Sequence, residues 1–203
     1  MRRTQYQALM VDSVPAAVVG DGMEYRTPSV VGVCMDTADL LSFRKEKDEF
    51  FKHGEQSPLP HDARHTFEGL AYYPPNAELV FDVTLDPTEP TEVQISTTDG
   101  AERTYMRVAT ATVTVDGTDT TMALYSSGHE SLFLPFHDTT SGKETYGAGR
   151  YIDVHPNGDG TAVIDFNYAY APFCAYNDLY SCALPPAENW LDVAIRAGEQ
   201  TAQ

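Results

Sequence analysis

The chain has 203 residues, and its 30 acidic and 13 basic side chains give a formal net charge of −17. This length suits one domain with a substantial core, and so negative a chain is a poor partner for the phosphate backbone of a nucleic acid. No apolar run reaches the roughly 18 residues of a membrane span, so we expect no contact with a membrane.

Residues 1–36 are expected to form a neutral, poorly ordered tail in front of a single domain over residues 37–200. Arg2-Arg3 resembles the start of a twin-arginine export signal, but Gln5 and Gln7 follow where an apolar core would be needed, so we reject a signal peptide. Three cysteines do not make a secreted disulfide framework. We therefore expect a cytoplasmic protein.

The acidic residues are scattered along the domain instead of forming a cluster. Scattered carboxylates favour a solvated surface adapted to high salt over a site for cations or basic partners. A halophilic host is a hypothesis that follows from this acidity.

The first well-marked element is a helix from about Thr37 to His53, which Asp36 or Thr37 can cap. Opposite charges four residues apart, Arg44 and Asp48, are expected on its solvent face. Gly54 provides a left-handed stop. The apolar residues recur near helical spacing and predict one stripe that packs on the domain: Leu40, Phe43, Phe50 and Phe51.

Beyond residue 78 the β-branched and aromatic content predicts antiparallel strands. Along the longest expected strand the apolar residues switch between even and odd positions. A bulge near Val108 would keep them all on one face. Many strands at hairpin spacing behind one helix indicate a mainly β fold, an antiparallel barrel or sandwich with an N-terminal α-helix packed on it. The strands are expected at 79–85, 92–97, 103–115, 120–125, 132–136, 151–154, 161–167 and around 191–195.

Ionisable residues concentrate on a Gly-rich loop over residues 138–150. Glu144, paired with Asp165 of a later strand, could perform acid–base catalysis if burial separated their pKa values. Arg150 could clamp an anionic substrate through its two-pronged guanidinium, or could instead pair with Asp138 or Glu144 to hold the loop. The other candidates on this loop are Asp138, Lys143 and Tyr146.

Asp165 and Asn167 project from the same side of their expected strand, about 7 Å apart. They would either face water or line a polar cavity. The aromatic loop that follows adds two more candidates, Tyr176 and Asn177, and its rings could stack a flat ligand or simply close the core.

Cys174 and Cys182 are expected to be buried thiols, with a local disulfide as the alternative. Zinc would need two further ligands, and His129 and His137 would lie about 26 Å apart at the ends of an extended strand. We therefore expect no metal. The chain also lacks a Gly-x-Ser-x-Gly elbow and a phosphate-binding loop, so no cofactor is expected.

Several separated blocks resemble an uncharacterised prokaryotic family, domain-of-unknown-function family 1684, over about residues 38–199. Ala171 and Ala183 depart from the family pattern, which has Asn and Pro at these places. The resemblance implies a unit of structure and an intracellular setting, but no reaction. The blocks begin at Phe43, Leu70, Leu134, Gly149, Asp165, Pro172 and Leu184.

Together these patterns predict a protein that binds, and as an enzyme would hydrolyse or isomerise, a small polar or anionic molecule. The site would be built from residues 138–150, 165–167 and 172–189, with Glu144 or Asp165 as general base. The alternative is a non-catalytic protein-interaction module that uses the same surface. The identity of any protein partner is open.

Overall fold

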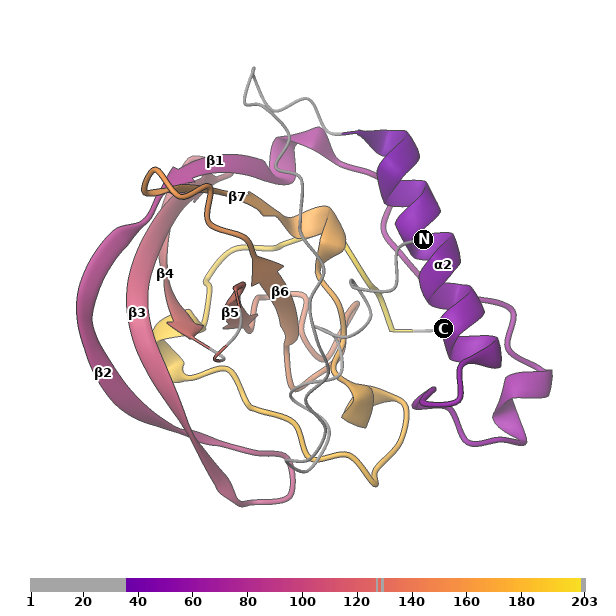
Figure 1. The fold of residues 1–203 in the computed structure, drawn as a ribbon. Helices are drawn as coiled ribbons and strands as arrows, with labels where there is room; N and C mark the ends of the chain where they lie inside the picture. The colour runs from indigo at the N-terminus through magenta and orange to yellow at the C-terminus, as the bar shows by residue number, and fades with distance from the viewer. Residues whose placement is uncertain (1–35, 127, 129, 202–203) are drawn as a thin grey trace.

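The computed structural model describes residues 36–126, 128 and 130–201 (Figure 1). The expected N-terminal tail, apart from Asp36, lies outside the described residues, as do Cys34 and His129.

One α-helix, α2 (Thr37–His53), precedes seven strands in the described part of the chain. The side chain of Asp36 caps the helix by accepting hydrogen bonds from the backbone N–H groups of Ala38 and Asp39. Gly54 ends it with φ −66°, an extended conformation, so the expected left-handed stop is wrong. None of the helices described here is long and apolar enough to cross a membrane.

The strands form two antiparallel sheets, which fit a sandwich better than a closed barrel. The larger sheet has the order β2-β3-β4-β5-β6, and the smaller one pairs β1 with β7. The strands are β1 (Val80–Thr84), β2 (Asp86–Ser96), β3 (Glu102–Val115), β4 (Thr118–Ser126), β5 (Leu132–Phe136), β6 (Arg150–Val154) and β7 (Thr161–Asp165).

The bulge expected near Val108 is present, because the register between β3 and β4 shifts between Arg107 and Ala109. The predicted strand 161–167 ends earlier than expected. Its last two residues belong to the 3-10 helix η3 (Phe166–Tyr168), and the Asp165 side chain caps that helix by accepting from the Asn167 N–H.

Both faces of strands β4 to β6 are buried, because successive side chains of a strand alternate between its faces. On β4, Leu124 belongs to the larger core with β1 and β7, whereas Tyr125 belongs to a second cluster on the other face. Tyr170 and Ala183, from the segments that follow β7, cover that second cluster.

The C-terminal segment (residues 191–201) is not the strand that its alternating pattern predicts, although Leu191, Val193 and Ile195 do point into the larger core. Its backbone pairs with loops: Thr139 N–H donates to Val193 O. Gly198 has φ 75°, and a Cβ there would lie 2.5 Å from Ala169 O, so glycine permits the close approach.

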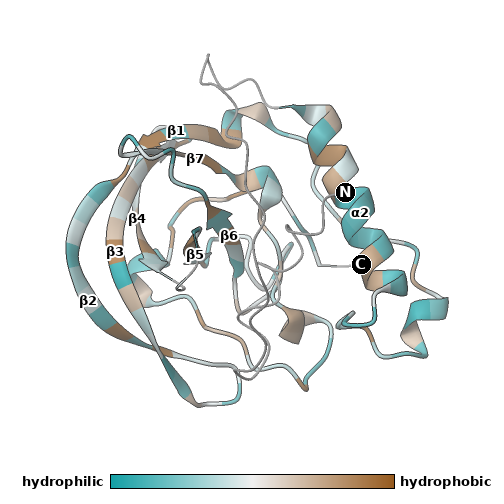
Figure 2. Cartoon of the chain, viewed as in Figure 1, coloured by the Kyte–Doolittle hydropathy of each residue, from teal (hydrophilic) through white to brown (hydrophobic). Residues whose placement is uncertain are grey.

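Helix α2 packs beside the sheets, and the C-terminal segment runs toward it (Figure 1). The residues of α2 that are buried include two cations: Leu40, Arg44, Lys47 and Phe51. The middle turns of the helix are coloured hydrophilic in Figure 2 although part of their surface is buried. The expectation that Arg44 lies on the solvent face is therefore wrong.

Candidate functional site

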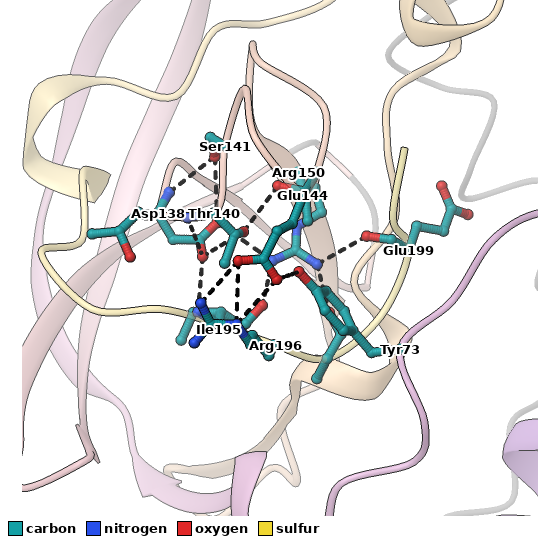
Figure 3. A network of polar contacts seen from close by, with 12 residues as sticks. Tyr73, Asp138, Thr140, Ser141, Glu144, Arg150, Ile195, Arg196 and Glu199 are labelled. Atoms are coloured by element: carbon teal, nitrogen blue, oxygen red, sulfur yellow. Dashed lines mark hydrogen bonds and ion pairs between the residues drawn. The ribbon is translucent and has the colours of Figure 1, made fainter. Parts of the chain in front are cut away.

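Arg150, the first residue of β6, lies at the centre of a buried polar network (Figure 3). Its Nη1 donates to the carbonyl oxygens of Ala197 and Glu199. Its Nη2 donates to the Ile195 carbonyl and, at 3.4 Å, to the Asp138 carboxylate. Burial lowers the pKa of Arg150, and the charge of Asp138 opposes that shift. Arg150 thus fastens the C-terminal segment to the start of the 138–150 loop.

The Asp138 carboxylate is fully occupied by protein donors. It accepts hydrogen bonds from the backbone and hydroxyl of Thr140, from the hydroxyl of Ser141 and from the backbone N–H of Ile195. The carboxylate is buried, and the neighbouring Arg150 guanidinium balances its negative charge.

Glu144 lies nearer the surface, with a side chain that is 36% exposed. It forms a two-pronged ion pair with Arg196 and accepts a hydrogen bond from the Tyr73 hydroxyl at 2.9 Å. These two partners lower the pKa of Glu144, whereas burial together with the Glu144 hydrogen bond raises the pKa of Tyr73. Glu144 is therefore an ionised carboxylate at neutral pH, and a weak base.

A second buried ion pair joins Lys47 of α2 to Glu199 of the C-terminal segment. The other carboxylate oxygen of Glu199 accepts from the Ala171 N–H at 2.8 Å and from the Tyr176 hydroxyl at 2.7 Å. The Lys47 ammonium also lies over the Tyr170 ring. Neither Lys47 nor Glu199 was among the candidates of the sequence analysis.

A third cluster lies where α2 approaches the end of β7. The Asn167 side chain exchanges two hydrogen bonds with the backbone of Asn76 and donates a third to Asp165. Arg44 stacks over the Tyr72 ring and donates to the Asn167 carbonyl. Burial raises the pKa of Asp165 and lowers that of Arg44, and each charge opposes the shift of the other.

The remaining candidates lie apart from these clusters. The Lys143 ammonium is exposed and donates to Thr139 O. The Asn177 side chain donates to Pro58 O. The Tyr146 hydroxyl donates to the Cys174 thiol at 3.7 Å.

The structure therefore brings together Asp138, Glu144 and Arg150, and joins them to Tyr176 through Glu199. Asp165 and Asn167 form a separate cluster with Arg44. In the described part of the chain, no group of three or more His, Cys, Asp or Glu residues is arranged to hold a metal ion.

Comparison with known proteins finds a matching family model and similar solved structures. The model of a family described as "Protein of unknown function (DUF1684)" matches residues 65–200. The solution NMR structure of an uncharacterized protein from Haloarcula marismortui is similar with a TM-score of 0.64 and 39% identity, covering 81% of this chain and 93% of that one. A search of curated proteins finds no match.

Proposed function

This chain belongs to the DUF1684 family, whose description names no activity, and from its structure we propose that it binds a small polar or anionic molecule where α2 meets the end of β7. One observation carries the proposal: Arg44 and Asp165 both hydrogen-bond to Asn167 but do not form an ion pair with each other among the described residues. Two opposite charges that are close but unpaired can each bind a different group of one ligand.

Each of these side chains keeps an atom for a ligand. The Arg44 Nε is buried and has no hydrogen-bond partner among the described residues. The hydrogen bonds of Asp165 use its Oδ1, which accepts from the backbone and the side chain of Asn167. A buried donor without an acceptor costs about 1–3 kcal/mol, so a ligand that supplies one is favoured.

The chemistry of the two groups defines the ligand. The guanidinium attracts a carboxylate or phosphate, and the Asp165 carboxylate accepts a proton or a hydrogen bond from a neighbouring hydroxyl or amine. A small acid with an adjacent hydroxyl or amino group meets both requirements. We assign to Arg44 the anion-binding role that the sequence suggested for Arg150, because Arg150 is fully buried and already pairs with the Asp138 carboxylate, whereas Arg44 has no ion-pair partner among the described residues.

If the protein is an enzyme, Asp165 is the better general base of the two carboxylates proposed from sequence. A base works best when its pKa approaches the working pH. Burial raises the pKa of Asp165, whereas Arg196 and Tyr73 lower that of Glu144. Hydrolysis by a water that a base activates, and isomerisation next to a carbonyl group, both use such a proton transfer.

Native mass spectrometry of the protein purified from its own cells tests the proposal, followed by thermal-shift titration with hydroxy acids, amino acids and phosphate monoesters. We expect a retained small molecule, or stabilisation by one of these classes. Arg44→Lys and Asp165→Asn should each weaken that binding at least tenfold, or about 1.4 kcal/mol. Arg196→Lys, whose guanidinium pairs with Glu144 near the surface, is the matched control. Wild-type protein that carries nothing and responds to no class would refute the proposal.

A second candidate, the interaction module, is favoured by two exposed apolar side chains. Leu179 is 91% exposed and Trp190 is 61% exposed. The Trp190 ring is held in place by stacking on His137 and by a hydrogen bond from its Nε1 to Pro185 O. Rigid exposed aromatic residues are typical of binding hot spots. A co-purifying protein chain that Trp190→Ala releases would favour this candidate over the first.

A further inference from the structure

Cys174 and Cys182 are both reduced and lie against each other. Cys174 belongs to the 3-10 helix η4 (Phe173–Ala175), and its backbone N–H donates to the Cys182 sulfur at 3.3 Å. The two thiols are also hydrogen-bonded to one another. A disulfide would form if a side-chain rotation brought these two neighbouring sulfur atoms to the bonding distance of about 2.05 Å.

Neighbouring hydroxyl groups surround this thiol pair. The Tyr146 hydroxyl donates to the Cys174 sulfur, and Thr98 forms a further hydrogen bond to the same thiol. The backbone N–H of Cys182 donates to the Thr98 hydroxyl at 3.1 Å, which fixes the second cysteine beside the first. The hydrogen bond from Cys182, and then those from Tyr146 and Thr98, lower the pKa of Cys174 to about 7 against the effect of burial.

The two cysteines differ in access to solvent. Cys174 is 7% exposed, whereas Cys182 is 0% exposed. A small oxidant can reach only the first of them, and the second can react only with its neighbour. This asymmetry matches an attacking thiol and a resolving thiol.

We propose that Cys174 and Cys182 form a site of reversible oxidation by hydroperoxides, with Cys174 as the attacking thiol and Cys182 as the resolving thiol. This inference is independent of ligand binding at Arg44 and Asp165. The Cys174 thiolate attacks one oxygen of the hydroperoxide, so that an S–O bond forms and the O–O bond breaks. The departing oxygen takes up a proton and leaves as water, or as an alcohol from an organic hydroperoxide.

The second step closes the disulfide. The Cys182 sulfur attacks the sulfur of the Cys174 sulfenic acid, an S–S bond forms, and the S–O bond breaks with release of water. Two thiols and one hydrogen peroxide thus give one disulfide and two water molecules, with two electrons passing from sulfur to the peroxide. A dithiol reductant such as dithiothreitol returns both cysteines to thiols by exchange.

The test uses the full chain with Cys34→Ser, so that only two thiols remain. After hydrogen peroxide, we expect a mass loss of about 2 Da, a peptide linking Cys174 to Cys182, and recovery with dithiothreitol. Cys182→Ser should instead accumulate a sulfenic acid at Cys174 that dimedone captures. Cys174→Ser should leave Cys182 reduced.

Tyr146→Phe tests whether the Tyr146 hydrogen bond activates the Cys174 thiol, or whether the closeness of the two cysteines is sufficient. If loss of this hydrogen bond raises the Cys174 pKa by one unit, the thiolate fraction at pH 6 falls almost tenfold. A more basic thiolate is also more nucleophilic, which offsets part of this loss. Oxidation should therefore slow by about threefold. Tyr180→Phe, whose ring packs on Phe173, is the matched control and should oxidise at the wild-type rate. Thiols that survive peroxide, oxidise only to sulfinic acid, or cross-link between chains would overturn the proposal.

Discussion

Lys47 and Glu199 form an ion pair across 152 residues of sequence, and each side chain is only 1% exposed. Because Glu199 also accepts from Tyr176 and its carbonyl accepts from Arg150, this pair joins three parts of the molecule. They are helix α2, the aromatic loop after β7, and the loop that begins at Asp138. The pair compensates the charge of Lys47 on the buried face of α2, where Leu40 and Phe51 are the buried apolar side chains.

Removing one member of this pair should strongly destabilise the fold. Lys47→Met leaves the Glu199 carboxylate buried without its cation, and a broken buried pair costs about 3–5 kcal/mol. Urea denaturation followed by circular dichroism measures this loss. Lys45→Met, on the exposed face of the same helix, should change the free energy of unfolding by less than about 0.5 kcal/mol.

The double variant Lys47→Met/Glu199→Gln tests whether the two charges stabilise each other. Glutamine keeps an acceptor for Ala171 and Tyr176 but needs no cation, so the double variant should be more stable than the sum of the single losses predicts. Strictly additive losses would mean that the two charges are not coupled.

Arg150→Lys should lower the free energy of unfolding by at least about 2 kcal/mol, because an ammonium cannot replace a guanidinium that serves several fixed acceptors. Hydrogen exchange should also quicken at Ile195, whose N–H donates to Asp138. Arg196→Lys is the exposed counterpart, and its loss should stay below about 1 kcal/mol. Wild-type stability in Arg150→Lys would show that the network contributes little to folding.

Local patterns in the sequence predicted most of the fold. The expected strand 132–136 coincides with β5, and the parity change on the longest strand correctly predicted the bulge. The family match over residues 65–200 confirms the resemblance that the sequence blocks suggested. The strand and the bulge follow from the alternation of apolar and polar side chains along the chain, and this alternation is visible in a single sequence.

The inward cations of α2 could not be predicted in the same way, because their partners are distant in sequence. Leu40, Arg44, Lys47 and Phe51 do follow one helical stripe, but a charged residue on a stripe normally faces water. The buried carboxylate of Glu199 and the carbonyl oxygens of Tyr73 and Asn167 make these inward positions favourable. The alternation at 191–195 likewise predicted correctly which side chains are buried. It could not show whether a neighbouring strand is there to pair with this segment.

Asp165 should make the protein less stable as pH rises through the acidic range. Burial raises its pKa in the folded state above 3.8, so the folded protein holds this proton at pH values where the unfolded chain has lost it. The free energy of unfolding therefore falls between pH 3.8 and the raised value, by at most about 1.4 kcal/mol per pKa unit, and the loss is complete above it.

Comparing wild type with Asp165→Asn isolates this effect, because Asp48, with a pKa raised in the same direction, and Glu144, with a lowered one, are present in both proteins. Denaturation midpoints from pH 4 to pH 7 should show wild type losing stability relative to the variant. Wild-type stability that stays constant or rises relative to the variant as pH increases would contradict the raised pKa.

Salt should stabilise the protein, because its formal charge of −17 repels itself more strongly in the compact state. The screening length falls from about 10 Å at 0.1 M salt to about 3 Å at 1 M. If screening contributes about 2 kcal/mol over that range, the melting temperature should rise by about 4–8 °C. Calorimetry in potassium chloride measures the rise.

A charge-reduced variant distinguishes screening from a general effect of salt on apolar burial. Asp86, Glu89 and Glu92 are exposed on β2, so Asp86→Asn/Glu89→Gln/Glu92→Gln removes three negative charges without touching the core. Because less repulsion remains to be screened, the melting temperature of this variant should be higher at low salt and should rise less with added salt. An equal rise in both proteins would attribute the stabilisation to apolar burial, which salts also strengthen. A melting temperature that does not rise at all would refute the halophilic interpretation of the acidic surface.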